Sequence, residues 1–519
     1  MQVRTTKTGS GSIAVQVVKR HHHKTEIVKH IGSTKDAKQV EALIILAHQF
    51  IRNADKTQPI FPELFPQEKQ QHLLSVDHIE FTKTYHHFAY EFFSFFYEWN
   101  GFNKVGNSIL RDFAIMRLIE PASKETSRTL LKEYFHISCS NDRLYSGLQL
   151  LLQQKALIEQ AAVAYAKTHL SFDFSLVFYD VTTLYFETFK ADEDVTDNKG
   201  NTVEGLRKNG FGKEHKPGQP LILIGLVVNR DGYPIGIELF PGKTFEGHTM
   251  IPVVKRLQEK YAIKTLTIVA DAAMLSMDNM KEIADAKLSY IVGARLGNIP
   301  HKLIADISAY LDKKESKYYA VGTKHGTLIC DYSNKRATKD KSDRKKQLDK
   351  SKYQIDNPEQ TKRKARFVSE ETKATLTLNE ELIKQDELRE GIKGYYTNLV
   401  LDEKLTPMNI IARYHDLWHV EKAFRMAKSD LKARPIFHHK KESIQAHMLI
   451  VFVSLCIAKS IELLSKFSIK QVKKHVWPVQ DIEFIDTITG KVFLKRMSTK
   501  DNPMITLWKT LEAKMQNEY

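Results

Sequence analysis

Cysteine is scarce in this sequence of 519 residues, and apolar runs are short. The three cysteines, Cys139, Cys330 and Cys456, are odd in number and far apart, which excludes a disulfide framework and a zinc site built on paired cysteines. The longest apolar run, Met448–Ala458, is too short to span a bilayer and predicts a buried core helix. Since the amino terminus lacks the apolar core of a secretory signal, we expect a cytoplasmic protein of a bacterial cell with no membrane partner.

Acidic residues are outnumbered by basic ones. The chain has 78 Lys and Arg against 62 Asp and Glu, which gives a net charge of +16 and a pI near 9.3. Such an excess attracts a protein to phosphates or to anionic membrane surfaces. Because the sequence favours a soluble chain, nucleic acid is the leading expected partner.

Hydrophobic patterning divides the chain into five regions. Residues 1–170 are mostly helical, 171–300 combine strands with helices, 301–390 interrupt that pattern with many basic residues, 391–470 return to a strand and long helices, and 471–519 form a tail that is a candidate for dimerisation. Strands that begin as an antiparallel hairpin and then alternate with helices indicate a mixed sheet. The predicted fold class is therefore α/β, preceded by a helical region in which the first helix is capped by Thr34.

A helix-turn-helix pattern lies within the N-terminal region. Asn107–Phe135 predicts two helices separated at Pro121, with Lys124, Arg128 and Lys132 on the second helix. Such a helix pair also occurs in ordinary helical bundles, so a purely structural role stays open. Given the basic charge of the chain, contact of Arg128 and Lys132 with DNA is the functional alternative.

The densest basic segment lies between residues 301 and 390. It includes Lys345, Lys346, Lys362 and Arg363. A solvated helical face would explain this composition without any ligand. A surface that follows a DNA backbone would explain it equally well.

A carboxylate interrupts a strongly apolar strand. In the stretch SLVFYDVTTLYFE, Asp180 is surrounded by β-branched and aromatic residues. An unpaired buried carboxylate is costly, so either a cation meets Asp180 or this strand lies at an exposed edge. A second acid, Asp271, stands where the apolar strand in TLTIVADAAM ends. A single Asp there is usually a turn or a helix cap, but ligands of α/β sheets bind at the carboxyl ends of strands.

A third acid lies on a predicted helix with an unusual face. On a helical wheel, Tyr414, Glu421 and Lys428 fall on one narrow stripe together with Trp418 and Arg425. A packing face would carry aliphatic residues instead. The charged and aromatic stripe therefore indicates a functional face, with an ordinary amphipathic surface helix as the alternative.

Together these blocks resemble the DDE transposases of bacterial insertion sequences, in the branch with a Tyr-x2-Arg-x3-Glu-x6-Lys signature. Tyr414, Glu421 and Lys428 match that signature, whereas Leu417 stands in the position of its Arg. The resemblance also includes YDVTTLYFE and IVADAAM, and it extends over Phe172–Lys466.

The resemblance implies a ribonuclease-H-like catalytic domain with a mostly β insertion. It places Asp180 on the first strand, Asp271 after the fourth strand and Glu421 on a late helix. These three acids would be the catalytic residues and the ligands of two Mg²⁺ ions, which Mn²⁺ can replace. Hard divalent ions prefer carboxylate oxygens, and two of them can stabilise both the attacking and the leaving oxygen of a phosphodiester.

The implied function is cleavage of the inverted-repeat ends of an insertion element and their joining to target DNA, by a chain that is at least a homodimer in the double-stranded DNA complex. By the same resemblance, Trp418 would stack a flipped base. Tyr414 and Lys428 would hold phosphates, and Arg425, one turn beyond Glu421 on the same stripe, or Arg413 would supply the phosphate contact of the missing Arg. Two alternatives stay open: a nuclease of the same fold without strand transfer, and an inactive DNA-binding derivative.

Overall fold

A computed structural model describes the chain except for residues 22–23, 55–77, 197–199, 201, 213–217, 273, 275, 361–362, 373–374, 435, 437, 489, 499–500 and 518–519. Two compact units are present. The first combines residues 1–88 with 477–502, and the second combines 89–476 with 503–519. This division differs from the expected boundary at residue 170, because helices beyond residue 88 belong to the same unit as the large sheet.

Two three-stranded antiparallel sheets make up most of the first unit. One contains β1 (Gln2–Lys7), β2 (Ile13–His21) and β3 (Lys24–Thr34), and the other contains β4 (Ile79–Tyr85), β17 (Gln480–Asp486) and β18 (Val492–Met497). Helix α1 (Ala37–Ala54) packs on the first sheet. The expected cap by Thr34 is wrong: Thr34 ends β3, and its hydroxyl accepts a hydrogen bond from the Asp36 backbone N–H, before the helix begins.

The second unit contains a helical bundle. Its helices are α2 (His87–Trp99, which starts at the boundary between the units), α3 (Ser108–Ile119), α4 (Lys124–Phe135), α5 (Asn141–Gln153), α6 (Lys155–His169), α14 (Lys441–Ser465), α15 (Ile469–Val476) and α16 (Pro503–Asn517). The expected break at Pro121 is confirmed, since α3 ends before it and α4 begins after it, with Ser123 as N-cap. The side chain of Ser123 accepts from the Thr126 backbone N–H, which satisfies a donor left open at the helix start.

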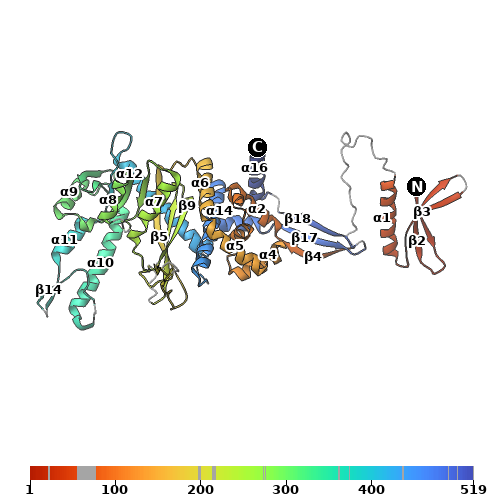
Figure 1. Ribbon diagram of the computed structural model, residues 1–519, viewed down its shortest axis with the longest axis horizontal. Helices are drawn as coiled ribbons and strands as arrows, with labels where there is room; N and C mark the ends of the chain where they lie inside the picture. The colour runs from red at the N-terminus through yellow and green to blue at the C-terminus, as the bar shows by residue number, and fades with distance from the viewer. Residues whose placement is uncertain are drawn as a thin grey trace. The chain divides into compact units, whose positions relative to one another are not determined.

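Helix α14 is the core of this bundle. By length and composition alone it is the one described helix that could cross a membrane, yet 78% of its most apolar window is buried inside the protein. It packs against α3, α5 and α6 and against the edge strand β9 (Figure 1). The core helix expected from the apolar run is therefore confirmed.

One eight-stranded mixed sheet forms the centre of the second unit. Its order is β12 (Tyr318–Thr323), β13 (Gly326–Tyr332), β16 (Ile392–Thr397), β11 (Ser289–Ala294), β10 (Thr267–Ala270), β5 (Leu176–Tyr185), β8 (Leu221–Val228) and β9 (Pro234–Pro241). β5, β10 and β11 are parallel, and the other neighbours are antiparallel. The predicted α/β class is confirmed, as is the β8–β9 hairpin, whose turn uses Gly232 at φ 77°.

Helices cover both faces of this sheet near β5, β8 and β9. On one face, Thr182 and Leu226 meet Phe424 and residues of α14. On the other face, Gly236 of β9 lies next to Glu159 of α6 and to α7 (Met250–Tyr261). The arrangement buries apolar strands between two helical layers, and α8 (Met277–Asp285) continues the cover beside β11.

The region 301–390 is not mostly β, so that expectation is wrong. Its longest element is the helix α10 (Asn334–Asp356), accompanied by α9 (His301–Leu311), α11 (Glu380–Leu388) and the short strands β14 (Val368–Thr372) and β15 (Thr375–Leu378). The 23-residue α10 is rich in Lys and Asp and contains no valine, a composition that favours helix over strand.

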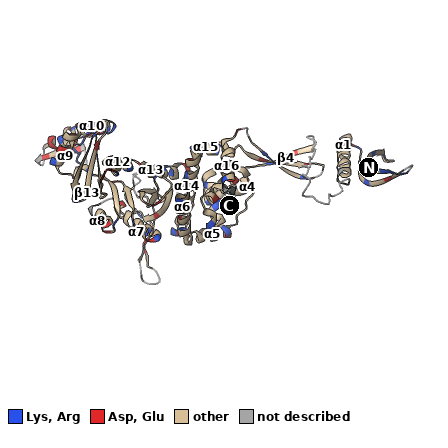
Figure 2. Cartoon of the chain, turned by 90° about the horizontal axis from the view of Figure 1, so that it is seen from above, with Lys and Arg blue, Asp and Glu red and all other residues tan. Residues whose placement is uncertain are grey.

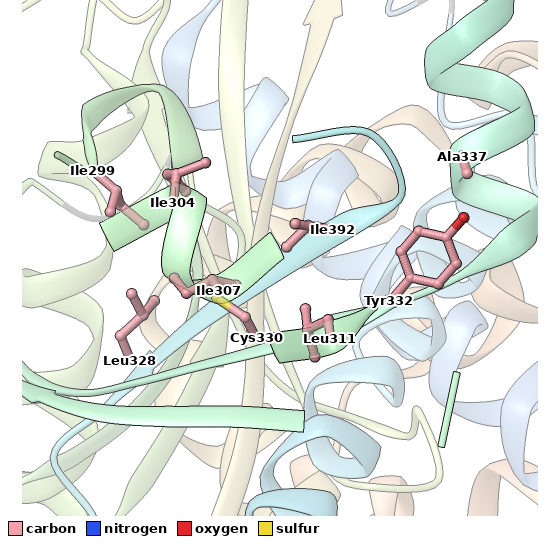
Figure 3. Close-up of a cluster of buried hydrophobic side chains, with 9 residues drawn as sticks. All are labelled: Ile299, Ile304, Ile307, Leu311, Leu328, Cys330, Tyr332, Ala337 and Ile392. Carbon is pink, nitrogen blue, oxygen red and sulfur yellow. The ribbon is translucent and has the colours of Figure 1, made fainter. Parts of the chain in front are cut away.

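The same region is built onto the large sheet. β12 and β13 extend the sheet beyond β16, and α9 covers them. Ile304 and Ile307 of α9 pack against Leu328 and Cys330 of β13, with Ile392 of β16 beside them (Figure 3). The insertion therefore shares a hydrophobic core with the strands that follow Asp271.

Candidate active site

Asp180 and Asp271 come from neighbouring strands. β5 and β10 are parallel, and Ala270 stands opposite Tyr179, so the next residues, Asp271 and Asp180, lie side by side in register. Each carboxylate accepts a hydrogen bond from the backbone N–H that follows it, at 2.7 Å for Asp271 and 2.8 Å for Asp180. β5 lies between β10 and β8. The exposed-edge explanation for Asp180 is thereby excluded.

Asp180 faces the helices that carry the third acid. Thr182 and Leu184, two and four residues along β5, line a small apolar space together with Phe424 and Lys428. Residues two apart on a strand share a face, so Asp180 points to the side on which α13 (Trp418–Arg425) packs against β5.

Tyr414 joins Asp271 directly. Its hydroxyl donates to Asp271 Oδ1 at 3.2 Å, and it comes from α12 (Pro407–His415). Burial raises the pKa of the Tyr414 phenol, and the charge and hydrogen bond of Asp271 and the charge of Glu421 raise it further. Tyr414 therefore stays a neutral donor that orients the Asp271 carboxylate, within range of the charge of Glu421.

Lys393 of β16 is a site residue that our sequence reasoning missed. Its Nζ lies 4.5 Å from the centre of the Tyr414 ring. Burial and the charge of Arg336 lower the pKa of Lys393, while Asp331, Asp271 and Glu421 act in the opposite direction. The signal was present, because Lys393 is a charged residue within the apolar strand GIKGYYT, as Asp180 is within its own strand.

A group of polar side chains, Asp331, Tyr395 and His415, lies next to Tyr414. The Tyr395 hydroxyl donates to Asp331 Oδ1 at 3.2 Å and lies 3.2 Å from His415 Nε2. Burial raises the pKa of Asp331. The Tyr395 ring meets the Tyr414 ring edge-on at 4.9 Å, which helps to fix Tyr414 in position.

The helix that we predicted from Tyr414 to Lys428 is interrupted. Leu417 and Val420 donate their backbone N–H to carbonyls only three residues back, so the turn tightens between α12 and α13. Residues 426–430 then form a π-helix, η7. The single stripe of the helical wheel is therefore wrong, although Glu421 still lies close enough to Tyr414 for its charge to raise the pKa of that phenol.

The remaining residues of that segment differ in exposure. Leu417, in the position of the signature Arg, is buried. In this chain the side chain at that position therefore packs in the core. Trp418 is 48% exposed and stacks on the His419 ring. Arg425 is exposed, whereas Lys428 is half-buried and lines the apolar space beside Phe424.

A basic cleft of about 770 Å³ includes Lys393 in its lining. It lies between α10, α11 and the strands β11 and β16, and it shares Arg336 and Lys393 with the site. Eight basic and four acidic residues line it: Arg295, Arg336, Arg344, Lys346, Lys350, Arg366, Arg389 and Lys393, with Asp340, Asp343, Asp349 and Asp386. Figure 2 shows basic and acidic residues gathered around α9 and α10. The excess of positive charge makes the cleft suited to a polyanion.

The structure places the other predicted DNA contacts as follows. Lys345 and Lys346 are exposed on α10, and Arg363 is exposed after it. Lys362 lies outside the described residues. On α4, Lys132 is exposed, while Arg128 pairs with Glu125 at 3.3 Å and donates to Asn141. Their contact with DNA stays a prediction.

The described residues contain no trio of His, Cys, Asp or Glu already gathered around a metal position. The donor chemistry nevertheless fits a hard divalent ion, because Asp180, Asp271 and Glu421 offer only carboxylate oxygens. Two of these acids are adjacent in register, and Glu421 is exposed on the helix that packs against β5.

Gly293 of β11 provides a test of this packing. A Cβ at Gly293 would lie 2.7 Å from the Tyr414 hydroxyl and 3.2 Å from Ala272 Cβ, whereas a Cβ at Gly297 would meet nothing within 4 Å. We expect Gly293→Ala to lower the free energy of unfolding by about 1–3 kcal/mol and Gly297→Ala to have little effect.

Adding Tyr414→Phe to Gly293→Ala removes the atom that the new methyl group meets. We therefore expect the double variant to be less destabilised than the sum of the single variants, as measured by denaturant unfolding. Additive effects would show that Tyr414 does not lie over Gly293.

Residues 173–457 match the family described as "Transposase DDE domain", a span that includes Asp180, Asp271 and Glu421. Among solved structures, the chain is similar to the piggyBac transposase in its synaptic complex with hairpin DNA, at 10% identity and a TM-score of 0.34, over 75% of this chain and 70% of that one. No curated protein sequence matched.

Proposed function

The chain belongs to the transposase DDE domain family, and on that basis we propose that it cleaves the inverted-repeat ends of a bacterial insertion sequence and joins them to target DNA. The observation that carries the proposal is the adjacency of Asp180 and Asp271 on central strands, with Tyr414 bonded to Asp271 and charge-coupled to Glu421. We place this activity in the bacterial cytoplasm, on nucleoid DNA.

Asp180, Asp271 and Glu421 would hold two Mg²⁺ or Mn²⁺ ions. When bound, such ions supply positive charge to both the attacking and the leaving oxygen of the phosphodiester. Glu421 is exposed on α13 and would complete the ligand set by turning its side chain toward the two aspartates. Tyr414 holds Asp271 Oδ1 through its hydroxyl, and Lys393 adds a positive charge beside the reacting phosphate.

DNA would reach this site along the basic cleft. The cleft contains Lys393 and Arg336. A DNA backbone bound in the cleft would therefore have one end close to the candidate catalytic carboxylates. Trp418 exposes its ring one turn before Glu421 and offers a stacking surface for a base. Arg425, exposed one turn after Glu421, is positioned to take a phosphate contact. Joining two ends requires two such sites, hence at least a homodimer on DNA.

Exposed charges of α10 are expected to contribute to non-specific DNA binding. Lys345→Gln with Lys346→Gln should reduce the slope of log K against log salt by up to about 0.9 for each phosphate that the protein no longer neutralises. Lys264→Gln with Lys281→Gln removes the same charge from exposed positions outside the cleft and serves as the control. The slopes of log K against log salt are measured by fluorescence anisotropy. Equal slopes for the two double variants would show that α10 is a solvated surface that does not contact DNA.

Strand transfer separates this proposal from a nuclease of the same fold. The test supplies DNA ends that are already cut, with free 3′-hydroxyls, together with a circular target. A transposase joins those ends to the target, and the Glu421→Gln variant does not. A protein that cuts intact ends but never joins pre-cut ends would be a nuclease.

A further inference from the structure

A second cavity, of about 350 Å³, lies at the amino-terminal end of α4, in the helix pair singled out by its helix-turn-helix pattern. It is enclosed by α3, α4, α5, α14 and the segment that follows η7. Six side chains that can carry positive charge line it: Arg117, Lys124, Lys432, Arg434, His438 and His447. Among the described residues of its lining Glu125 is the one acid, and it is exposed and pairs with Arg128.

Lys124 is buried within this cavity, with 9% of its surface exposed. Its Nζ lies 2.8 Å from His438 Nε2 and 3.4 Å from His447 Nδ1. His447 Nε2 lies 3.3 Å from the Ala433 carbonyl, so this nitrogen is the protonated one and Nδ1 accepts. An ammonium has three N–H donors. Two point to neutral imidazoles, and the third has no acceptor among the described residues, which leaves it for a ligand.

Arg117 adds a second buried cation. It is 8% exposed and donates from Nη1 to the carbonyls of Leu431 and Lys432, both at 2.9 Å. Within the described part of the chain, the hydrogen-bond partners of Arg117 and Lys124 are thus uncharged carbonyls and imidazoles. Burying cations without a counter-charge is costly, which favours an anion as the occupant.

The cavity also lies close to the catalytic strand. The guanidinium of Arg434 stands over the Tyr185 ring at 5.6 Å, and Tyr185 is the last residue of β5, which carries Asp180. The positive end of the 12-residue helix α4 faces the same cavity and adds to its attraction for a phosphate.

We propose that this cavity binds a phosphate group of the DNA backbone, through Lys124 and Arg434, and so holds the DNA at a point separate from the basic cleft. The assignment of DNA rests on the proposed function, whereas binding of the oxyanion does not. A free phosphate has the same chemistry, and the experiment below distinguishes the two sources.

Sulfate, whose charge does not change near neutral pH, is the first probe. Thermal unfolding of the full chain is followed with sodium sulfate and with sodium chloride at equal ionic strength, for the wild type, Lys124→Gln and the control Lys264→Gln. Sulfate should raise the Tm of the wild type and the control by the same amount and have a smaller effect on Lys124→Gln. Because burial and Arg117 lower the pKa of Lys124 to about 7, the specific effect should be larger at pH 6 than at pH 8.

The variant also separates binding from a structural role. Lys124→Gln removes a buried charge, so its Tm without sulfate should equal or exceed that of the wild type. Should this variant fail to fold, Lys432→Gln at the exposed rim takes its place, with a reduced sulfate effect expected. An equal sulfate response in the wild type and in the variant that folds would overturn the proposal.

Duplex DNA is the second probe. Lys124→Gln should weaken DNA binding by about tenfold, the value of one charge-assisted hydrogen bond, and reduce the salt slope by about 0.9. Loss of the sulfate response with unchanged DNA affinity would overturn the DNA assignment in favour of a free anion. Absence of cleavage by the wild type would instead defeat the proposed function and leave the sulfate result standing.

Discussion

Asp271→Asn is expected to reduce DNA strand cleavage by at least about a thousandfold, while binding to the DNA ends stays within about tenfold of the wild type. An amide cannot balance the charge of a divalent ion as a carboxylate does. It keeps an oxygen that accepts from the Tyr414 hydroxyl, which now bonds to Asp271 Oδ1 at 3.2 Å. The variant should therefore keep the geometry of the site and lose DNA strand cleavage.

Asp180→Asn and Glu421→Gln should give the same result. The matched control is Asp285→Asn, an exposed carboxylate at the end of α8, which should cleave as the wild type does. Cleavage is measured on end-labelled DNA, and folding by thermal unfolding. If one of the three variants cuts DNA near the wild-type rate, the residue that it replaces does not belong to the active site.

Removal of divalent ions is expected to abolish cleavage completely. Mg²⁺ or Mn²⁺ should restore it, and Ca²⁺ should suppress it, because calcium is larger and accepts looser geometries. The lining of the basic cleft includes Arg295, Arg389 and Lys350, which need no metal to bind a phosphate backbone. DNA binding should therefore persist in chelator.

That persistence is the internal control for the metal experiment. A chelator that removed both binding and cleavage would point to a metal with a role in folding or in DNA recognition. Full cleavage in excess chelator would contradict the assignment of the three acids to metal ions.

Local sequence patterns predicted the central part of this fold well. The apolar strand around Asp180, the strand that ends before Asp271 and the hairpin at Gly232 all formed as expected. Each depends on neighbours within a few residues, through alternation, β-branched content or turn chemistry. The α/β class followed from the order of those elements.

Contacts between distant segments could not be predicted in this way. β12 and β13 join the sheet next to β16 because Cys330 and Ile329 pair with Gly394 and Tyr395, more than sixty residues further along the chain. The resemblance suggested a β insertion, and the helical composition of α10 was the better local guide. Helix propensity predicted a helix in this region and the family resemblance predicted strands, and the helix was the correct prediction.

The candidate site shows the same division. Asp180 stood out because a charge in an apolar strand needs an explanation, and the same signal marks Lys393. Asp271 stood out because it directly follows an apolar strand, where ligands of α/β sheets bind. The break between Tyr414 and Trp418 left no such signal, because three-residue hydrogen bonds at Leu417 use ordinary helix-forming residues. A helical wheel assumes 3.6 residues per turn throughout, which this segment does not keep.

One measurement tests the central claim most directly. The protein is incubated with Mg²⁺ and labelled DNA that carries the inverted repeats flanking its own gene, with a scrambled-end DNA alongside. We expect cuts at the junction between each repeat and its flank, followed by joined products, with neither produced by Glu421→Gln. Cleavage at the same rate on scrambled ends, or cleavage that Glu421→Gln retains, would contradict a DDE transposase acting on its own element.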